Sequence, residues 1–244
     1  MTFWARYPRD VVRVTGADAV TYLQSQVSQD LRPLAVGSST WTFVLEPTGK
    51  VDVLARVWRR GDDELILDTD DGFGEALIAR IDRFKIRVKA DVEVLGWSCV
   101  AVRGEGAASI DGLASWGSGV DLLGPDAQPP SGIAEGSTAE LEAARIAAAW
   151  PAMGHEIVPG QTIPAETGVI DVAVSFTKGC YPGQELVERM DSRSATAPRS
   201  VRRVTVPTGS AAGDPVVADG VEVGHITSVA GTRALALVRR DTPT

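Results

Sequence analysis

The chain has 244 residues, of which 44% are hydrophobic and 23% are charged. That balance is typical of a globular protein with a well-buried core, and it excludes a largely disordered chain. A formal net charge of -8 disfavours general binding to the phosphate backbone of nucleic acids.

Neither a membrane span nor a secretory signal is expected. No run of about 18 apolar residues occurs, and the N-terminus lacks a long apolar core. The two cysteines, Cys99 and Cys180, lie far apart in the chain. Such a pair, without a signal peptide, indicates reduced thiols rather than a disulfide framework. We therefore expect a cytoplasmic protein.

The first 95 residues alternate between strand and helix patterns. Runs rich in β-branched residues predict strands over residues 11–14, 41–45, 51–58, 65–67 and 88–95, and Pro47-Thr48-Gly49 predicts a hairpin between the second and third runs. Asp18 is a candidate cap for a helix with Val20, Leu23 and Val27 on one side. A second helix has its predicted buried face at Phe73, Ala76, Leu77, Ile81 and Phe84. Together these patterns predict an α+β layer, with helices on one face of a largely antiparallel sheet.

The remaining chain divides into two further units. Strands are predicted over residues 99–102 and 120–123, followed by a helix that Ser137 or Thr138 caps and that Pro151 ends. Residues 151–177 carry many turn signals. Short β runs over residues 200–206, 215–217, 221–226 and 234–238, with a hairpin turn at Asp219-Gly220, predict a small β-barrel. The predicted domains are residues 1–95, 96–195 and 196–244.

Several standard sites are excluded because their residues are missing. The sequence has no Gly-x-Ser-x-Gly elbow, no Walker A loop and no complete dinucleotide-binding fingerprint. Two histidines and two scattered cysteines do not have the spacing of zinc ligands, so no metal site is predicted.

One segment has residues suited to thiol chemistry, the octapeptide Lys178-Gly179-Cys180-Tyr181-Pro182-Gly183-Gln184-Glu185. Its two glycines permit a close backbone approach or a positive φ. Pro182 favours the first turn of a short helix over residues 184–190, which puts Cys180 just outside a helix N-terminus. That end of the helix and Lys178 both favour a thiolate. From the residues alone two interpretations stay open: a reactive or metal-binding sulfur, or a small buried apolar residue.

Two other features also have a structural and a functional interpretation. Cys99 lies in an apolar strand, where a buried structural role is favoured. A basic stretch stands out in this acidic chain, and it is either a solvated edge strand or a site for an anionic ligand or partner. Its members are Arg80, Arg83, Lys85, Arg87 and Lys89.

The octapeptide resembles the signature of the YgfZ family of folate-binding proteins, which act in iron–sulfur cluster assembly and repair. The similarity covers essentially the whole chain. Further matching segments are residues 14–19, residues 22–26 with Asp30, and residues 80–88, 145–151 and 213–237.

The resemblance implies the fold of the glycine-cleavage T-protein, in which three domains surround a central channel that admits a tetrahydrofolate. The β-barrel would be the third domain. The resemblance also implies an accessory protein that binds folate and maintains 4Fe–4S enzymes, including radical enzymes that modify tRNA. Its partners would be iron–sulfur enzymes or cluster carriers, with no membrane binding and no direct nucleic-acid binding.

The same resemblance implies roles for residues of the octapeptide. Cys180 would be the reactive or cluster-contacting thiol, and Lys178 would supply positive charge beside it. Gly179, Tyr181 and Gly183 belong to the same loop. Gln184 and Glu185 would anchor that loop by hydrogen bonds, and Arg189 would pair with Glu185 on the helix surface. The resemblance does not identify the residues that contact folate.

One departure from the wider superfamily bears on the chemistry. Aminomethyltransferases carry an acidic pair where this chain has Val53 and Leu54. Apolar side chains cannot accept a proton, and Asp52 is offset from those positions. An accessory role is therefore favoured over folate-dependent aminomethyl transfer, and a docking scaffold is the other alternative. With two distant cysteines, one chain cannot supply four thiolates to a cluster.

Overall fold

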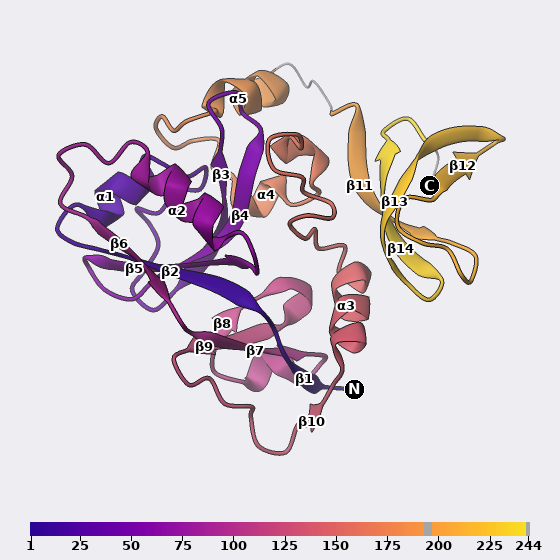
Figure 1. Cartoon of the computed structure of the whole chain (residues 1–244), viewed down its shortest axis with the longest axis horizontal. Coiled ribbons are helices and arrows are strands. Elements are labelled where there is room, and N and C mark those ends of the chain that lie inside the picture. The colour runs from indigo at the N-terminus through magenta and orange to yellow at the C-terminus, as the bar shows by residue number, and fades with distance from the viewer. Residues whose placement is uncertain (193–196, 243–244) are drawn as a thin grey trace.

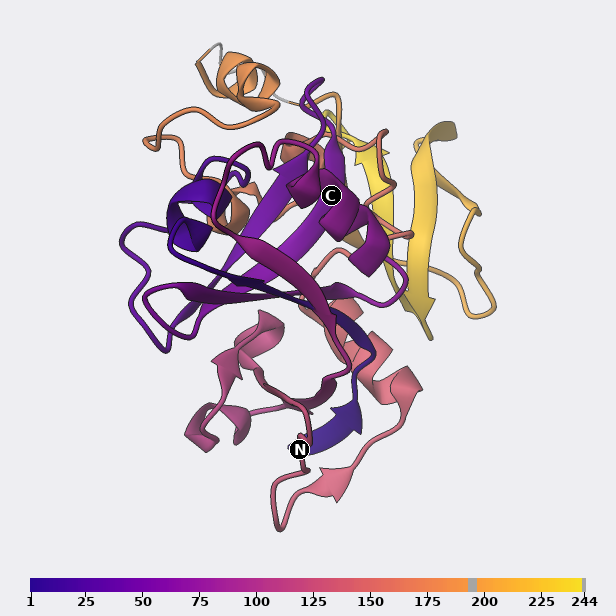
Figure 2. The same cartoon turned by 60° about the vertical axis from the view of Figure 1, so that its left-hand side comes forward.

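The computed structural model describes residues 1–192 and 197–242, and these residues form three β-sheets joined by short helices (Figure 1). The predicted α+β class is confirmed, with a small β domain at the C-terminal end. In both views the yellow C-terminal strands and the pink second sheet lie on different sides of the purple first sheet (Figures 1 and 2). Within the described ranges, no helix is long and apolar enough to cross a membrane.

The first sheet is antiparallel throughout and has the strand order β3-β4-β5-β2-β6. Each predicted strand of this region is present. Their bounds are β2 (Arg9–Thr15), β3 (Ser39–Leu45), β4 (Val51–Arg59), β5 (Glu64–Asp70) and β6 (Asp91–Leu95). Helices α1 (Ala19–Gln24) and α2 (Gly74–Asp82) pack on one face, because apolar residues of both helices join strand residues in one buried cluster.

Two local predictions in this region are wrong. Asp18 stands at the N-cap of α1, but its side chain does not cap the helix; Asp18 Oδ2 accepts a hydrogen bond from the Lys89 backbone N–H at 2.8 Å. The predicted buried face of α2 holds at Leu77 and Ile81 but not at Ala76, which is exposed, or at Phe84, which lies beyond the end of the helix and is 41% exposed.

The second sheet has the order β10-β1-β7-β9-β8. Its strands are β1 (Phe3–Arg6), β7 (Ser98–Arg103), β8 (Leu113–Ala114), β9 (Val120–Gly124) and β10 (Ala134–Glu135), with 3-10 turns at Ala107–Ser109 and Trp116–Ser118. The sequence predicts β7 and β9 but not β1, which pairs with β7 instead of with the first sheet. Strand pairing therefore does not follow the predicted division at residue 95.

Helix α3 (Thr138–Ala147) follows the second sheet and begins as predicted. Ser137 Oγ accepts from the Glu140 N–H at 3.2 Å, and Glu140 Oε2 accepts from the Ser137 N–H at 2.8 Å, which completes a capping box.

The segment after α3 covers the other face of the first sheet. Met153, Ile157 and Ala173 share a buried cluster with strand residues such as Phe43 and Leu54. This segment contains a 3-10 turn at Pro164–Glu166 and helices α4 (Ile170–Ala173) and α5 (Gln184–Ser192). Buried residues between Met153 and Val187 therefore pack with the first sheet.

The C-terminal strands form a sheet of order β11-β14-β13-β12, and each predicted strand is present. They are β11 (Arg199–Thr205), β12 (Pro215–Ala218), β13 (Val221–Ala230) and β14 (Arg233–Arg239). The predicted hairpin turn is confirmed, since Asp219 and Gly220 have φ values of 51° and 76°.

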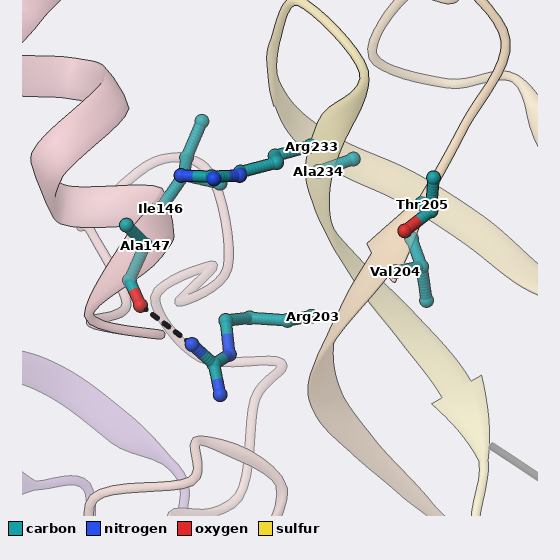
Figure 3. A pocket seen from close by; sticks show the side chains of 7 residues that line it. All are labelled: Ile146, Ala147, Arg203, Val204, Thr205, Arg233 and Ala234. Atoms are coloured by element: carbon teal, nitrogen blue, oxygen red, sulfur yellow. Dashed lines mark hydrogen bonds between the residues drawn. The ribbon is translucent and has the colours of Figure 1, made fainter.

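A buried carboxylate attaches this domain to the rest of the chain. Glu156 accepts hydrogen bonds from Arg145 at 2.7 Å, from Thr227 at 2.6 Å and from Ser228 at 2.7 Å. Beside this contact lies a cavity of about 470 Å³ between the end of α3 and the β domain (Figure 3). There the Arg203 guanidinium donates to the Ala147 carbonyl at 2.8 Å, which satisfies an unpaired group at the C-terminal end of α3.

Candidate functional site

The octapeptide forms a loop that is held on both sides of its cysteine. Lys178 and Tyr181 are buried, with 6% and 7% of their surface exposed, whereas Gly179 and Cys180 between them are exposed. Cys180 is therefore an exposed cysteine in a loop that is anchored on one side by Lys178 and on the other by Tyr181.

Lys178 is anchored by backbone carbonyls. Its Nζ donates to the carbonyl oxygens of Gln24 at 2.6 Å, Val27 at 2.5 Å and Gln29 at 2.9 Å. All three N–H groups of the ammonium are thereby used. Burial lowers the pKa of Lys178 to about 8. The three carbonyls belong to the end of α1 and the segment that follows it. The Lys178 ammonium therefore holds the octapeptide against that segment.

Tyr181 anchors the loop on the other side of the cysteine. Its ring belongs to the buried cluster between the first sheet and residues 151–192. Burial raises the pKa of Tyr181 to about 12. The Lys178 ammonium lies 5.2 Å from the centre of the ring, within range of a cation–π attraction. The two anchors therefore also contact each other.

The two glycines of the octapeptide have different roles. Gly183 has a φ of +81°, and a Cβ atom there would lie 2.4 Å from the Glu46 carbonyl oxygen, in the turn between β3 and β4. Gly183 therefore has both the close backbone approach and the positive φ that the sequence predicts for a glycine. Gly179 has neither a positive φ nor an atom within 4 Å of the place of a Cβ, so the predicted reason is wrong there.

Helix α5 begins at Gln184, as predicted, and side-chain pairs link its successive turns. Tyr181, Pro182 and Gly183 therefore separate Cys180 from it. Gln184 donates to Glu188, and Glu185 pairs with Arg189 as predicted. Both bonds lie within α5, so these two side chains do not anchor the loop in the predicted way.

A second feature lies between the first two sheets, a cavity of about 430 Å³ with aromatic walls. Trp41 of β3 and Trp150, which follows α3, contact each other with ring centroids 4.6 Å apart. Both indoles are half-buried. The cavity is lined by Ser39, Thr40, Trp41, Ala114, Ser115, Trp116, Trp150 and Val172.

Buried arginines stand behind the aromatic walls. Arg56 lies 5.4 Å from the Trp41 ring centre, and Arg103 lies 3.8 Å from that of Trp116. Arg56 of the first sheet bonds Asp68 at 2.9 Å and Asp121 of the second sheet at 2.8 Å. The Arg56 guanidinium holds the pKa of Asp121 below its ordinary value, although burial opposes the shift. This ion network fixes the two sheets, and hence the walls of the cavity, relative to each other.

The cavity and the octapeptide are joined through one short segment, Ser28-Gln29. Ser28 Oγ donates to the Ala173 carbonyl at 2.6 Å, and Gln29 Nε2 donates to the carbonyl of Val172, a cavity residue, at 3.0 Å. The Gln29 carbonyl in turn accepts from Lys178. A continuous set of hydrogen bonds therefore runs from the wall of the cavity to the base of the cysteine loop.

Within residues 1–192 and 197–242, none of the residues that line this cavity carries a carboxylate. Val53 and Leu54 are buried in apolar clusters on β4. Asp52 lies 3.2 Å from Arg80 Nε of α2, and its burial raises its pKa. Aromatic side chains of this kind can stack on a planar ring, whereas the residues that line the cavity include no acid for proton transfer.

Apart from Cys180, the described part of the chain offers few residues for metal binding or thiol chemistry. It contains no group of three or more His, Cys, Asp or Glu side chains that could hold a metal ion. Cys99 is buried on β7, and burial raises the pKa of its thiol well above the ordinary value. The favoured structural interpretation of Cys99 agrees with this position.

Sequence reasoning identified the octapeptide but missed the cavity. Its tryptophans come from segments far apart in the chain, and no local pattern links them. The sequence did contain one indication of Ser28-Gln29. This dipeptide lies between Gln26 and Asp30, which belong to a segment that matches the YgfZ family.

Comparison with known proteins was made at the level of sequence and of structure. A model of the CAF17 C-terminal beta-barrel domain matches residues 199–243. An uncharacterized protein of Haemophilus influenzae is 28% identical over 191 residues, which cover 76% of this chain and 67% of that protein. The iron–sulfur cluster assembly factor IBA57 homolog, mitochondrial, of Mycosarcoma maydis is 27% identical over 220 residues, 74% of this chain and 51% of that protein. The corresponding homolog of Neurospora crassa is 24% identical over 246 residues, 87% of this chain and 55% of that protein.

Among solved structures, the glycine cleavage system aminomethyltransferase T of Bartonella henselae superposes with a TM-score of 0.80 at 15% identity. The superposition covers 98% of this chain and 78% of that one. The implied T-protein fold is thereby confirmed, and the match at residues 199–243 identifies the C-terminal domain as a β-barrel. The chain spans about half the length of the two fungal relatives.

Proposed function

We propose that this chain, a YgfZ- and IBA57-like protein with the fold of the glycine-cleavage T-protein, is an accessory factor for the assembly or maintenance of iron–sulfur clusters in other proteins. Enzymes with 4Fe–4S clusters are the clients, including radical enzymes that modify tRNA. Such thiol chemistry needs a reducing compartment, and the cytoplasm is the location that we propose.

The observation that carries this proposal is the exposed thiol of Cys180 between two buried anchors. A thiol that only packs is buried, as Cys99 is, whereas a sulfur that meets a partner must be accessible. A fixed position on the surface lowers the entropy that is lost when the sulfur is bound.

The chemistry that we propose is ligation without a redox step. The Cys180 thiol loses its proton to water, and its sulfur replaces one partner thiolate at an iron of a cluster that the partner holds. One Fe–S bond forms as another breaks, and the displaced thiolate takes up a proton. When a client thiolate takes that position at the iron, Cys180 regains a proton. Because one chain lacks four thiolates, the remaining ligands come from the partner.

We propose further that the cavity between the first two sheets binds a tetrahydrofolate. Its half-buried indoles fit the stacking of a pterin ring, and its volume is within the ordinary range for small-molecule sites. Trp41 and Trp150 would bind the ring. Aminomethyl transfer is not part of the proposal, because neither the cavity wall nor the positions of Val53 and Leu54 supply the required carboxylate.

The role of Cys180 is tested by complementation. C180A is expressed in a strain that lacks the native protein, and the activity of a cluster-dependent tRNA thiolation enzyme is measured. We expect C180A to lose most of the rescue, and the conservative C180S as well, because a serine hydroxyl is a poor ligand for iron. C99A, which removes the other thiol, is the matched control and should keep rescue if it folds. Full rescue by well-folded C180A would remove the thiol from the mechanism, and rescue by C180S alone would favour a docking scaffold.

Folate binding is tested separately by calorimetric titration with tetrahydrofolate. W41A should weaken binding by about tenfold or more, because it removes one stacking face. C180A should bind like the wild type, since the thiol does not line the cavity. Equal affinity of W41A and the wild type would place any folate site elsewhere.

A further inference from the structure

The loop between α2 and β6 exposes apolar side chains beside positive charges. Ile86 is 77% exposed and Phe84 is 41% exposed, which is unusual for large apolar residues. The exposed cations Arg83, Arg87 and Lys89 lie in the same loop. We name these five residues the basic–apolar loop.

The positive charges of this loop are not compensated within the chain. Among the described residues, no carboxylate forms an ion pair with Arg83, Arg87 or Lys89. Lys85 differs, because its ammonium lies 2.9 Å from Asp82. In a chain with a net charge of -8, three neighbouring unpaired cations are a local excess that an acidic surface would complement.

A buried guanidinium with unused donors lies under the loop. Arg80 is 6% exposed, and its Nε donates to the Leu45 carbonyl at 2.7 Å. Both terminal nitrogens of Arg80 are buried without a hydrogen-bond partner among the described residues. The Phe84 ring covers the guanidinium at 5.1 Å. Arg80 pairs with Asp52 through its Nε, at 3.2 Å, but this leaves the two terminal nitrogens unsatisfied. Buried donors without a hydrogen bond are costly, so an acceptor that reached them would recover free energy.

The backbone of this loop contains an unusual conformation next to Ile86. Arg87 has a φ of 57°, a conformation that residues with a Cβ adopt rarely. The end of the loop is fixed to the start of α1 by two hydrogen bonds of the Lys89 backbone. Its N–H donates to the Asp18 carboxylate at 2.8 Å, and its carbonyl accepts from the Asp18 N–H at 3.1 Å. Strain that is maintained by such contacts is typical of functional surfaces.

We propose that the basic–apolar loop is a docking surface for an acidic protein partner. Ile86 enters an apolar pocket of the partner, and partner carboxylates pair with Arg83 and Arg87. Displacement of Phe84 opens Arg80 to one further carboxylate. The identity of the partner as an iron–sulfur protein rests on the proposed function.

A protein suits this surface better than a polyanion does. Aromatic and aliphatic side chains together with arginine are the composition of protein interface centres. An extended phosphate surface would meet the acidic remainder of the chain, whereas a single partner patch need cover only this loop.

The test is a binding titration of the full-length protein with a purified 4Fe–4S ferredoxin of strongly negative net charge. The wild type should bind, and the affinity should fall as salt is raised. I86D and R87E should each weaken binding by about tenfold or more. V217D, which alters a valine of the β-barrel that is 58% exposed, is the matched control and should bind like the wild type. In the complex, the side-chain ¹⁵Nη resonances of Arg80 should shift.

Other outcomes would overturn the proposal. The first is that the wild type does not bind the ferredoxin. The second is that I86D and R87E bind it with wild-type affinity. The third is that I86D and R87E keep ferredoxin binding and instead lose binding of tRNA or of anionic phosphatidylserine vesicles. C180A separates this proposal from the proposed function. It should dock normally while failing in complementation, whereas I86D should fail to dock with its Cys180 intact.

Discussion

At the scale of single residues, the octapeptide is an anchored loop and not a set of equivalent signature positions. Lys178 and Tyr181 are buried, and Cys180 alone presents a reactive side chain to solvent between them. Its glycines are alike in sequence, but only Gly183 has a positive φ and a close backbone neighbour.

This difference predicts unequal effects of alanine. G183A should lower the free energy of unfolding by at least about 1 kcal/mol, because an L-residue is strained at a φ of +81° and its Cβ meets the Glu46 carbonyl. G179A should change it by less than about 0.5 kcal/mol, since that site is open. Urea denaturation of both variants measures the contrast, and equal losses would contradict it.

Lys178 predicts a dependence of stability on pH. Burial lowers the pKa of the folded-state ammonium to about 8, with Asp30 opposing and Arg32 assisting the shift. In the unfolded chain the pKa is about 10.4. Between these values the unfolded chain binds a proton that the folded chain has released, so this residue makes the free energy of unfolding rise with pH.

K178M removes that contribution. Relative to K178M, the wild type should therefore gain stability as the pH rises from about 8 to about 10.4, with a slope of at most about 1.4 kcal/mol per pH unit. Parallel stability curves for the two proteins in this window would show that Lys178 has an ordinary pKa.

At the scale of elements, local patterns predicted the long strands and helices and failed where pairing is distant. The strands of the first sheet and of the β-barrel have clear apolar runs, and all were predicted. Strand β1 was missed because its partner β7 is nearly a hundred residues away, and a run of four residues does not indicate with which strand it pairs. Strands β8 and β10 have two residues each, too few for a period.

The attachment of the β-barrel depends on the buried Glu156. Its pKa is lowered chiefly by Arg145, against the opposing effect of burial. The stability that it contributes is therefore present above its unfolded pKa of about 4.3 and is lost as the pH falls through the folded value.

E156Q should lower the free energy of unfolding by about 3 kcal/mol near neutral pH, because Arg145 loses its buried partner. The difference between E156Q and the wild type should shrink as the pH falls below about 4.3, because the unfolded chain then binds a proton that the folded carboxylate, with its lowered pKa, does not. Thermal unfolding over this range measures the effect, and a loss that did not change with pH would exclude the ion pair as its cause.

At the scale of the whole molecule, the chain shares the fold of a glycine-cleavage aminomethyltransferase. A shared fold does not fix the activity, which depends on the side chains of the site. Here the cavity has indole walls and no carboxylate, and a hydrogen-bonded segment connects it with the cysteine loop. The octapeptide was visible in the sequence because its residues are contiguous. The cavity was not, because only the packing of two sheets and the segment after α3 brings Trp41, Trp116 and Trp150 together.

The central claim is that the Cys180 thiol handles an iron–sulfur cluster for another protein. The most direct measurement is reconstitution in vitro of a cluster-free 4Fe–4S client enzyme, followed by its recovered activity, with the wild type, C180A and C99A at equal concentration. We expect faster or fuller recovery with the wild type and with folded C99A, and no gain over the protein-free control with C180A. Equal recovery with C180A and the wild type would contradict the claim.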